Sequence, residues 1–269
     1  MRILADELGS LAYTVQLSQA GADDTTPVVL VHAGIADHRM WDALVPALAE
    51  RHTVIRYDLR GFGQSPPPSG PFRETDDLLK LLDHLGHERV HLVGASWGGR
   101  VALDFALAHP SRLRSLAVFS PPWRGYAWSE EMVAYDEAET AALEAGDLDT
   151  AVDVNLDMWL RGPARAWEDV AEGLADALRE PVRISLRNME AVDEQSLEPV
   201  AGDLAALALP VLVGVGKLDV ADFQDIARQY AETVPGAAFV EFPTAAHLIA
   251  LDAPEELAAA LRPFLAATR

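Results

Sequence analysis

Cysteine is missing from this chain of 269 residues. Its absence excludes disulfides, thiolate metal sites and a cysteine nucleophile, so a nucleophile has to be serine, threonine, aspartate, glutamate or lysine. Long apolar runs are missing too: none approaches the roughly 20 residues that a membrane-spanning helix needs. Asp6 and Glu7 stand where a secretory signal would be apolar. We therefore expect a cytoplasmic protein with no membrane partner.

Basic residues are scarce. The 21 lysines and arginines are outnumbered by 42 acidic residues, which gives a formal net charge of −21. Proteins bind nucleic acids and anionic membrane surfaces through Lys and Arg side chains that neutralise negative charge. We therefore expect no nucleic acid as a partner. Strongly acidic composition usually serves solubility, so it identifies no substrate.

Short β-rich runs alternate with helical stretches, which is typical of a mostly parallel sheet covered by helices. The runs that begin at Val28, Val90 and Val211 are continuously apolar, as strands buried on both faces are. The expected strands are Arg2–Asp6, Leu11–Leu17, Val28–His32, Thr53–Tyr57, Val90–Val93, Leu116–Phe119, Val211–Val215 and Ala238–Phe242. The predicted fold class is α/β, with an eight-stranded sheet whose first strand is antiparallel.

The alternation stops between Pro121 and about Leu204, where helical patterns occur without a convincing strand. Glycine and proline divide this stretch into segments. The expected helices are Glu130–Ala145, Asp147–Leu160, Ala164–Leu178 and Val182–Val192. The sequence thus predicts a core of residues 1–121 and 205–269, with residues 122–204 inserted as a helical cap.

A buried strand runs directly into Gly94-Ala95-Ser96-Trp97-Gly98 and out into a helix. The G-x-S-x-G pattern alone is weak, but its place between strand and helix makes it specific. A sharp turn there lifts the serine above the sheet, and glycines two positions to either side avoid clashes. The alternative is an ordinary glycine-rich connection between a strand and a helix. We expect Ser96 to be a nucleophile.

A serine hydroxyl needs a general base, and histidine has the suitable pKa. Downstream of Ser96 the chain has only His109 and His247. His109 ends the helix that starts at Ser96, about three turns away from it, whereas His247 follows a strand in a loop where α/β sites lie. Asp219, after the strand Val211–Val215, is the expected acid that orients His247. Asp222 comes later and suits the start of the next helix.

With nucleophile, acid and histidine in this order, the chain resembles the α/β-hydrolase family. The turn Asp58–Ser65 is similar to the family's D-x-R-G-x-G-x-S motif, and Pro254-Glu255-Glu256 to its P-E-E segment. His32-Ala33-Gly34 stands where the family has H-G-x, with Ala33 in place of the usual glycine. The resemblance implies that the backbone N–H groups of Gly34 and Trp97 form an oxyanion hole.

Within the family, the segment from Tyr57 to Pro122 most resembles small bacterial esterases and enol-lactonases. The resemblance implies hydrolysis of a small-molecule ester or lactone. A carbon–carbon bond (meta-cleavage product) hydrolase and a non-catalytic ligand-binding protein remain alternatives, and the oligomeric state stays open. Serine at the turn argues against haloalkane dehalogenases and epoxide hydrolases, which use aspartate there. The expected substrate-binding residues are Ile35, Trp123, Trp128, Trp159 and Leu248.

We expect neither a cofactor nor a metal ion. Gly214-Val215-Gly216 follows a strand but lacks the third glycine of a dinucleotide site. His84 and His87 lie among acids near the end of a surface helix, where solvated polar residues explain them more simply than metal binding does.

Overall fold

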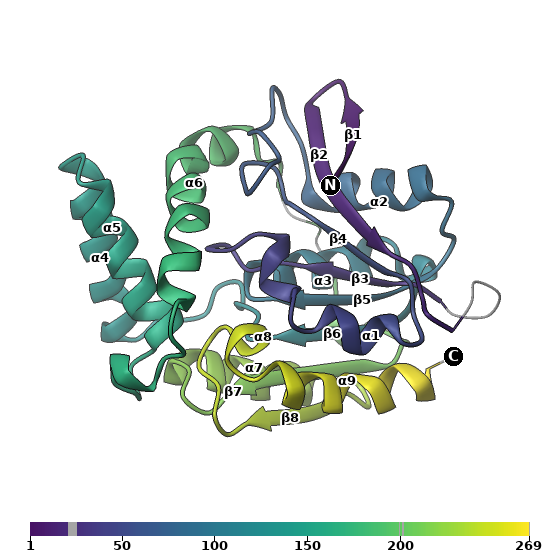
Figure 1. Cartoon of the computed structure of the whole chain (residues 1–269). Helices are drawn as coiled ribbons and strands as arrows, with labels where there is room; N and C mark the ends of the chain where they lie inside the picture. Colours follow the sequence, from purple (N-terminus) through teal and green to yellow (C-terminus); the bar gives the residue numbers. More distant parts are fainter. Residues whose placement is uncertain (21–25, 199, 201, 269) are drawn as a thin grey trace.

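The computed structural model describes residues 1–20, 26–198, 200 and 202–268. In this part of the chain, eight strands form one sheet in the order β1-β2-β4-β3-β5-β6-β7-β8 (Figure 1). The β1–β2 and β2–β4 pairs are antiparallel and the others parallel. The strands are β1 Arg2–Asp6, β2 Gly9–Gln16, β3 Val28–Val31, β4 Val54–Tyr57, β5 Val90–Ala95, β6 Leu113–Phe119, β7 Val211–Gly216 and β8 Ala238–Phe242. The predicted fold class is confirmed, and the strands differ from expectation only at their ends.

Helices cover both faces of the sheet, which explains the continuously apolar strands. In β3, Val28 and Leu30 join one core layer, and Val29 and Val31 join the other, because successive side chains of a strand point to opposite faces. The first layer packs against α1 Val45–Ala49, α8 Ile249–Asp252 and α9 Pro254–Ala267; the second packs against α2 Glu74–Leu85, α3 Trp97–Ala108 and α7 Ala221–Thr233.

Between β6 and β7 the described chain is helical, as expected. Figure 1 shows α4, α5 and α6 gathered beyond one end of the sheet. The elements are α4 Glu130–Glu144, α5 Leu148–Asn155, a π-helical turn Leu156–Arg161, a 3-10 turn Trp167–Asp169 and α6 Leu174–Gln195. None of the described helices has the length and apolar character needed to span a membrane.

The expected helix Ala164–Leu178 is wrong over most of its length, whereas the expected helix Val182–Val192 is found as part of a longer one. Residues 164–173 are mostly irregular, and α6 begins at Leu174 and runs through Pro181 without a break. A proline inside a helix loses one backbone hydrogen bond and costs about 3 kcal/mol. Here Leu178, Pro181 and Val182 are all buried on one side of α6. Burial of a Leu or Val side chain contributes roughly 1.5–3 kcal/mol, which offsets this cost.

Candidate active site

The turn between β5 and α3 holds Ser96 in a strained backbone conformation, with φ 50° and ψ −119°. A Cβ on Gly94 would lie 2.2 Å from the carbonyl oxygen of Gly98, and one on Gly98 would lie 2.4 Å from that of His32. No side chain fits at either position. The two glycines therefore allow the tight strand-to-helix turn that the sequence pattern predicts.

Ser96, His247 and Asp219 come together at the carboxyl ends of β5, β8 and β7. Nε2 of His247 lies 2.8 Å from Oγ of Ser96, and Nδ1 of His247 lies 3.0 Å from each carboxylate oxygen of Asp219. His247 and Asp219 are buried. With its proton on Nδ1 donated to the carboxylate, the imidazole leaves Nε2 free to accept the Ser96 hydroxyl proton.

The Asp219 carboxylate has two further donors. The Ser120 hydroxyl donates to Oδ2 at 2.8 Å, and the backbone N–H of Val220 donates to Oδ1 at 2.8 Å. Sequence reasoning missed Ser120; the available signal was a hydroxyl residue directly after the strand that neighbours β7. Asp222 instead accepts from the backbone N–H and the hydroxyl of Ser129, at 2.9 and 2.7 Å, which joins α7 to the start of α4.

The loop after β3 brings Gly34 beside the first residue of α3. A Cβ on Gly34 would lie 3.4 Å from Cβ of Trp97. Within the described residues, neither backbone N–H donates a hydrogen bond, so both are available to an oxygen at Ser96. The expected position of an oxyanion hole is therefore compatible with the geometry.

His32 anchors this loop. Its Nδ1–H donates to the carbonyl of Ala33 at 2.8 Å, and its Nε2 accepts from the backbone N–H of Leu59 at 3.0 Å. Burial lowers the pKa of His32, which keeps the ring neutral and fits this pattern of one donor and one acceptor. His32 is thus a structural residue that joins the loops after β3 and β4.

A cavity of about 490 Å³ opens over Ser96 and His247. Of the expected substrate-binding residues, Ile35, Trp128 and Trp159 line it, whereas Trp123 and Leu248 are not among its lining residues. Trp123 packs on Tyr230, with ring centroids 4.5 Å apart, and Leu248 is completely buried in the core beneath the loop. Large apolar residues near a site can serve either packing or a pocket, and only the three-dimensional arrangement separates the two.

Aromatic rings surround the histidine. The rings of Trp159 and Phe223 have centroids 4.6 and 4.5 Å from that of His247. Nε1–H of Trp159 donates to the Tyr135 hydroxyl at 2.9 Å, which fixes the indole over the imidazole. Sequence reasoning did not single out Phe223 or Tyr135, because their helical positions alone did not show that they face the cavity.

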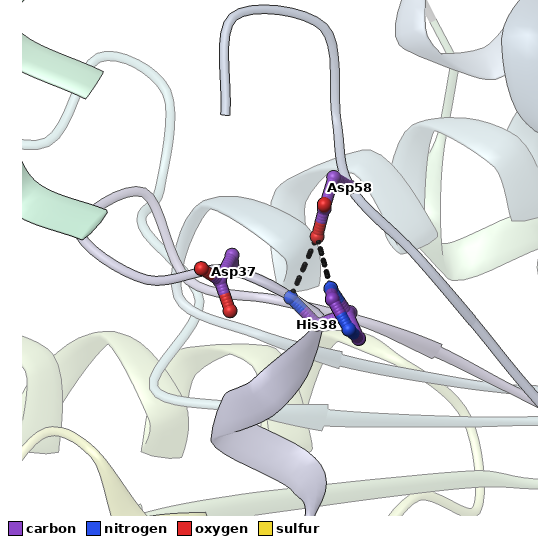
Figure 2. Close-up of side chains that lie close together, drawn as sticks. All are labelled: Asp37, His38 and Asp58. Atoms are coloured by element: carbon purple, nitrogen blue, oxygen red, sulfur yellow. Dashed lines mark hydrogen bonds and ion pairs between the residues drawn. The ribbon is translucent and has the colours of Figure 1, made fainter. Parts of the chain in front are cut away.

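Three groups near the loop after β3 lie close enough to hold a metal ion: Asp37, His38 and Asp58. Figure 2 shows the ring and the backbone N–H of His38 both directed at Asp58, at 2.6 and 2.9 Å from Oδ1. The Asp37 carboxylate is paired with Arg39 at 2.6 Å. Because each group already has a protein partner, this cluster serves to hold the loop after β3 against the turn after β4.

The family can be stated from this fold and site. The family model of the α/β hydrolase fold matches residues 26–254, and the chain belongs to this family. A pimeloyl-acyl-carrier-protein methyl ester esterase of Aeromonas hydrophila is 32% identical over 201 residues, which cover 71% of this chain and 76% of that protein. A soluble epoxide hydrolase of a Corynebacterium species is 42% identical over 83 residues, but these cover only 30% of this chain and 29% of that enzyme.

Solved structures of other hydrolases have the same fold. A thermophilic esterase from Thermogutta terrifontis superposes with a TM-score of 0.79 at 27% identity, covering 100% of this chain and 99% of that one. An enol-lactonase from Burkholderia xenovorans gives a TM-score of 0.80 over 98% of this chain and 100% of that one, and its 24% identity supports the fold alone. The family and its hydrolase relatives support a hydrolase as the class of this enzyme.

Proposed function

We propose that the protein is a serine hydrolase that cleaves a small-molecule carboxylic ester or lactone through an acyl-enzyme. The observation that carries the proposal is the continuous contact from the Asp219 carboxylate through the His247 ring to Oγ of Ser96, at 3.0 and 2.8 Å. This arrangement supplies a nucleophile, a base and an acid that orients the base. In the turn after β5 this chain has Ser96, whereas epoxide hydrolases have aspartate there. A serine nucleophile favours acyl chemistry.

In the proposed reaction, Oγ of Ser96 attacks the carbonyl carbon while Nε2 of His247 takes the hydroxyl proton. The carbonyl oxygen becomes an oxyanion, and the N–H groups of Gly34 and Trp97 stabilise it. The intermediate collapses, the bond to the alkoxide breaks, and His247 returns the proton to the leaving oxygen. Water, deprotonated by His247, then releases the acid from Ser96 by the same steps. Asp219 stabilises the imidazolium in both halves.

The walls of the cavity favour an uncharged substrate. Besides its aromatic rings, the cavity is lined by the acidic residues Glu74, Asp136, Glu139 and Asp193. Arg60 also lines the cavity. Its guanidinium is paired with Asp77 at 2.7 Å and with Asp6 at 2.8 Å, so its charge is already balanced within the protein. A carboxylate-bearing substrate would meet like charge in a confined space, which costs binding free energy. Neutral esters and lactones avoid this cost.

We also propose that residues 122–204 act as a cap. In support of this, Met132 of α4 and Leu186 and Met189 of α6 line the same cavity as Ser96. In this proposal, they contact the parts of the substrate that do not react. Substrate choice therefore depends mainly on the cap, and the chemistry depends on the core.

Two measurements test the proposed function. Purified protein is assayed with short p-nitrophenyl esters, and intact-protein mass is recorded after a fluorophosphonate probe. We expect turnover and a single adduct that maps to Ser96. A folded protein with neither turnover nor adduct would exclude a serine hydrolase and favour the ligand-binding alternative. Turnover of dienone carbon–carbon substrates with none of esters would instead favour the meta-cleavage alternative.

Replacing Trp159 with alanine is expected to change ester selectivity. The substitution removes apolar surface from the cavity and from the His247 ring. We expect the ratio of kcat/KM between short and medium acyl chains to shift by about tenfold, about 1.4 kcal/mol, while the fluorophosphonate still labels Ser96. Trp167, which is 41% exposed and does not line the cavity, supplies the control. If Trp159→Ala and Trp167→Ala both kept the original selectivity, Trp159 would serve packing alone.

A further inference from the structure

Two non-glycine residues of the described chain have positive φ: Ser96 at 50° and Ser120 at 47°. Such backbone conformations cost on the order of 1–3 kcal/mol, and they persist only where the surrounding structure fixes them. The tight turn after β5 accounts for Ser96. Nothing in that turn accounts for Ser120, which follows a different strand.

Ser120 is completely buried directly after β6. Its backbone N–H donates to the carbonyl of Gly214 in β7 at 2.8 Å, which extends the β6–β7 pairing by one residue. Its hydroxyl donates to Oδ2 of Asp219 at 2.8 Å. Because the hydrogen bond to Gly214 fixes the backbone, the strained conformation directs the side chain at the carboxylate.

The contacts of Asp219 are divided evenly between its two oxygens. Oδ1 accepts from the backbone N–H of Val220, Oδ2 accepts from the hydroxyl of Ser120, and Nδ1 of His247 lies 3.0 Å from both. Removing the Ser120 hydroxyl or the Val220 N–H leaves one carboxylate oxygen with Nδ1 of His247 as its single donor, and the other oxygen shares that donor. The carboxylate then keeps two of its three donors and is held less firmly about its terminal bond.

We propose that Ser120 is a positioning residue for the proposed hydrolysis, acting on His247 through Asp219; the inference rests on the proposed function. The hydroxyl holds the carboxylate plane toward Nδ1 of His247. By donating to Oδ2, it also withdraws negative charge that would otherwise stabilise the imidazolium. Ser120 thereby sets both the orientation of the base and the charge that the carboxylate presents to it.

Loss of the Ser120 hydroxyl should shift the pH dependence of the reaction in a defined direction. A carboxylate with one donor fewer carries more negative charge toward His247 and stabilises the positively charged ring. Since the neutral ring is the active base, the acid limb of the kcat/KM profile moves to higher pH. We expect a shift of roughly half a pH unit, together with a fall of about tenfold in kcat from looser orientation.

Other charged groups around the pair stay in place in such a variant. Asp252 of α8 accepts from the backbone N–H of Ala246 at 2.9 Å and pairs with Arg165 at 2.8 Å. Asp222 of α7 is bonded to Ser129. The groups that pack on the His247 ring, Trp159 and Phe223, carry no charge. A shift of the acid limb therefore reports the altered carboxylate.

The test compares Ser120→Ala and Ser120→Gly, both of which remove the hydroxyl. Glycine adopts positive φ without strain, so Ser120→Gly should melt at a higher temperature than Ser120→Ala. Both should show the same shifted acid limb and reduced kcat with p-nitrophenyl esters. Ser115→Ala is the matched control, because Ser115 is a buried serine of β6, the strand that Ser120 follows, and its hydroxyl contacts Nδ1 of His91 at 2.8 Å. We expect it to keep the wild-type profile.

A wild-type acid limb and kcat in both Ser120 variants would overturn the inference and leave Ser120 a packing residue. If Ser120→Ala does not fold, Ser120→Gly carries the test alone. The same shift in Ser115→Ala would also overturn the inference, because it would trace the effect to β6 and not to the carboxylate. Failure of the wild-type protein to hydrolyse esters or to take up the probe is a separate result that refutes the proposed function, and the inference with it.

Discussion

Ser96→Ala is expected to lower ester turnover by about ten-thousandfold or more, since the nucleophile and its base act as one unit. His247→Ala should cause a loss of similar size, because Nε2 of His247, 2.8 Å from Oγ of Ser96, is the acceptor for its proton. The double variant should be hardly worse than either single one, as no attack remains to be assisted. Initial rates with p-nitrophenyl acetate and circular dichroism spectra separate activity from folding.

Stability adds an independent check on the turn. Ser96 has φ 50°, so Ser96→Gly should be at least as stable as wild type and more stable than Ser96→Ala, although both are inactive. The control is His109→Ala, because His109 lies at the far end of α3 against Phe105. More than a few per cent of wild-type activity in a folded His247→Ala variant would require another base.

The strands could be predicted from the sequence because the physical cause of each is local. A run such as Val28–Val31 is apolar throughout, and only a strand covered on both faces buries all of it. The α6 helix could not be predicted in this way. Pro181 normally ends a helix, and its neighbours Leu178 and Val182 reveal their burial only when α6 is packed in place.

The residues of the site show the same difference between features with a local cause and features that depend on tertiary packing. Ser96, His247 and Asp219 stood out because each lies in the turn or loop after a predicted strand, and the carboxyl ends of parallel strands share one edge of the sheet. Their catalytic roles remain predictions. Ser120 also follows a strand, but its contact with Asp219 depends on a positive φ and on the neighbouring β7. Trp123 shows the reverse error: a tryptophan next to the site packs on Tyr230 instead of lining the cavity.

The identity of the acid is decided by comparing Asp219→Asn with Asp222→Asn. In the first variant one carboxylate oxygen becomes an NH₂ group. The Val220 N–H requires an acceptor on the Oδ1 side, so the amide would turn its NH₂ toward Ser120, whose hydroxyl is free to rotate and accept. Nδ1 of His247 then faces a donor as well as an acceptor, which favours the tautomer with its proton on Nε2.

That tautomer cannot accept the Ser96 proton, so Asp219→Asn should reduce kcat by about a thousandfold or more with little change in the fold. Asp222→Asn should keep activity within a few fold, because Asp222 contacts Ser129 and not His247. We expect Asp222→Asn to lower the free energy of unfolding by roughly 1 kcal/mol, because the hydrogen bonds that connect α7 to the start of α4 become weaker. Rate measurements and urea unfolding on both variants separate the two roles. The reverse ranking would move the acid to Asp222 and would contradict the contact between Asp219 and His247 on which the proposed mechanism depends.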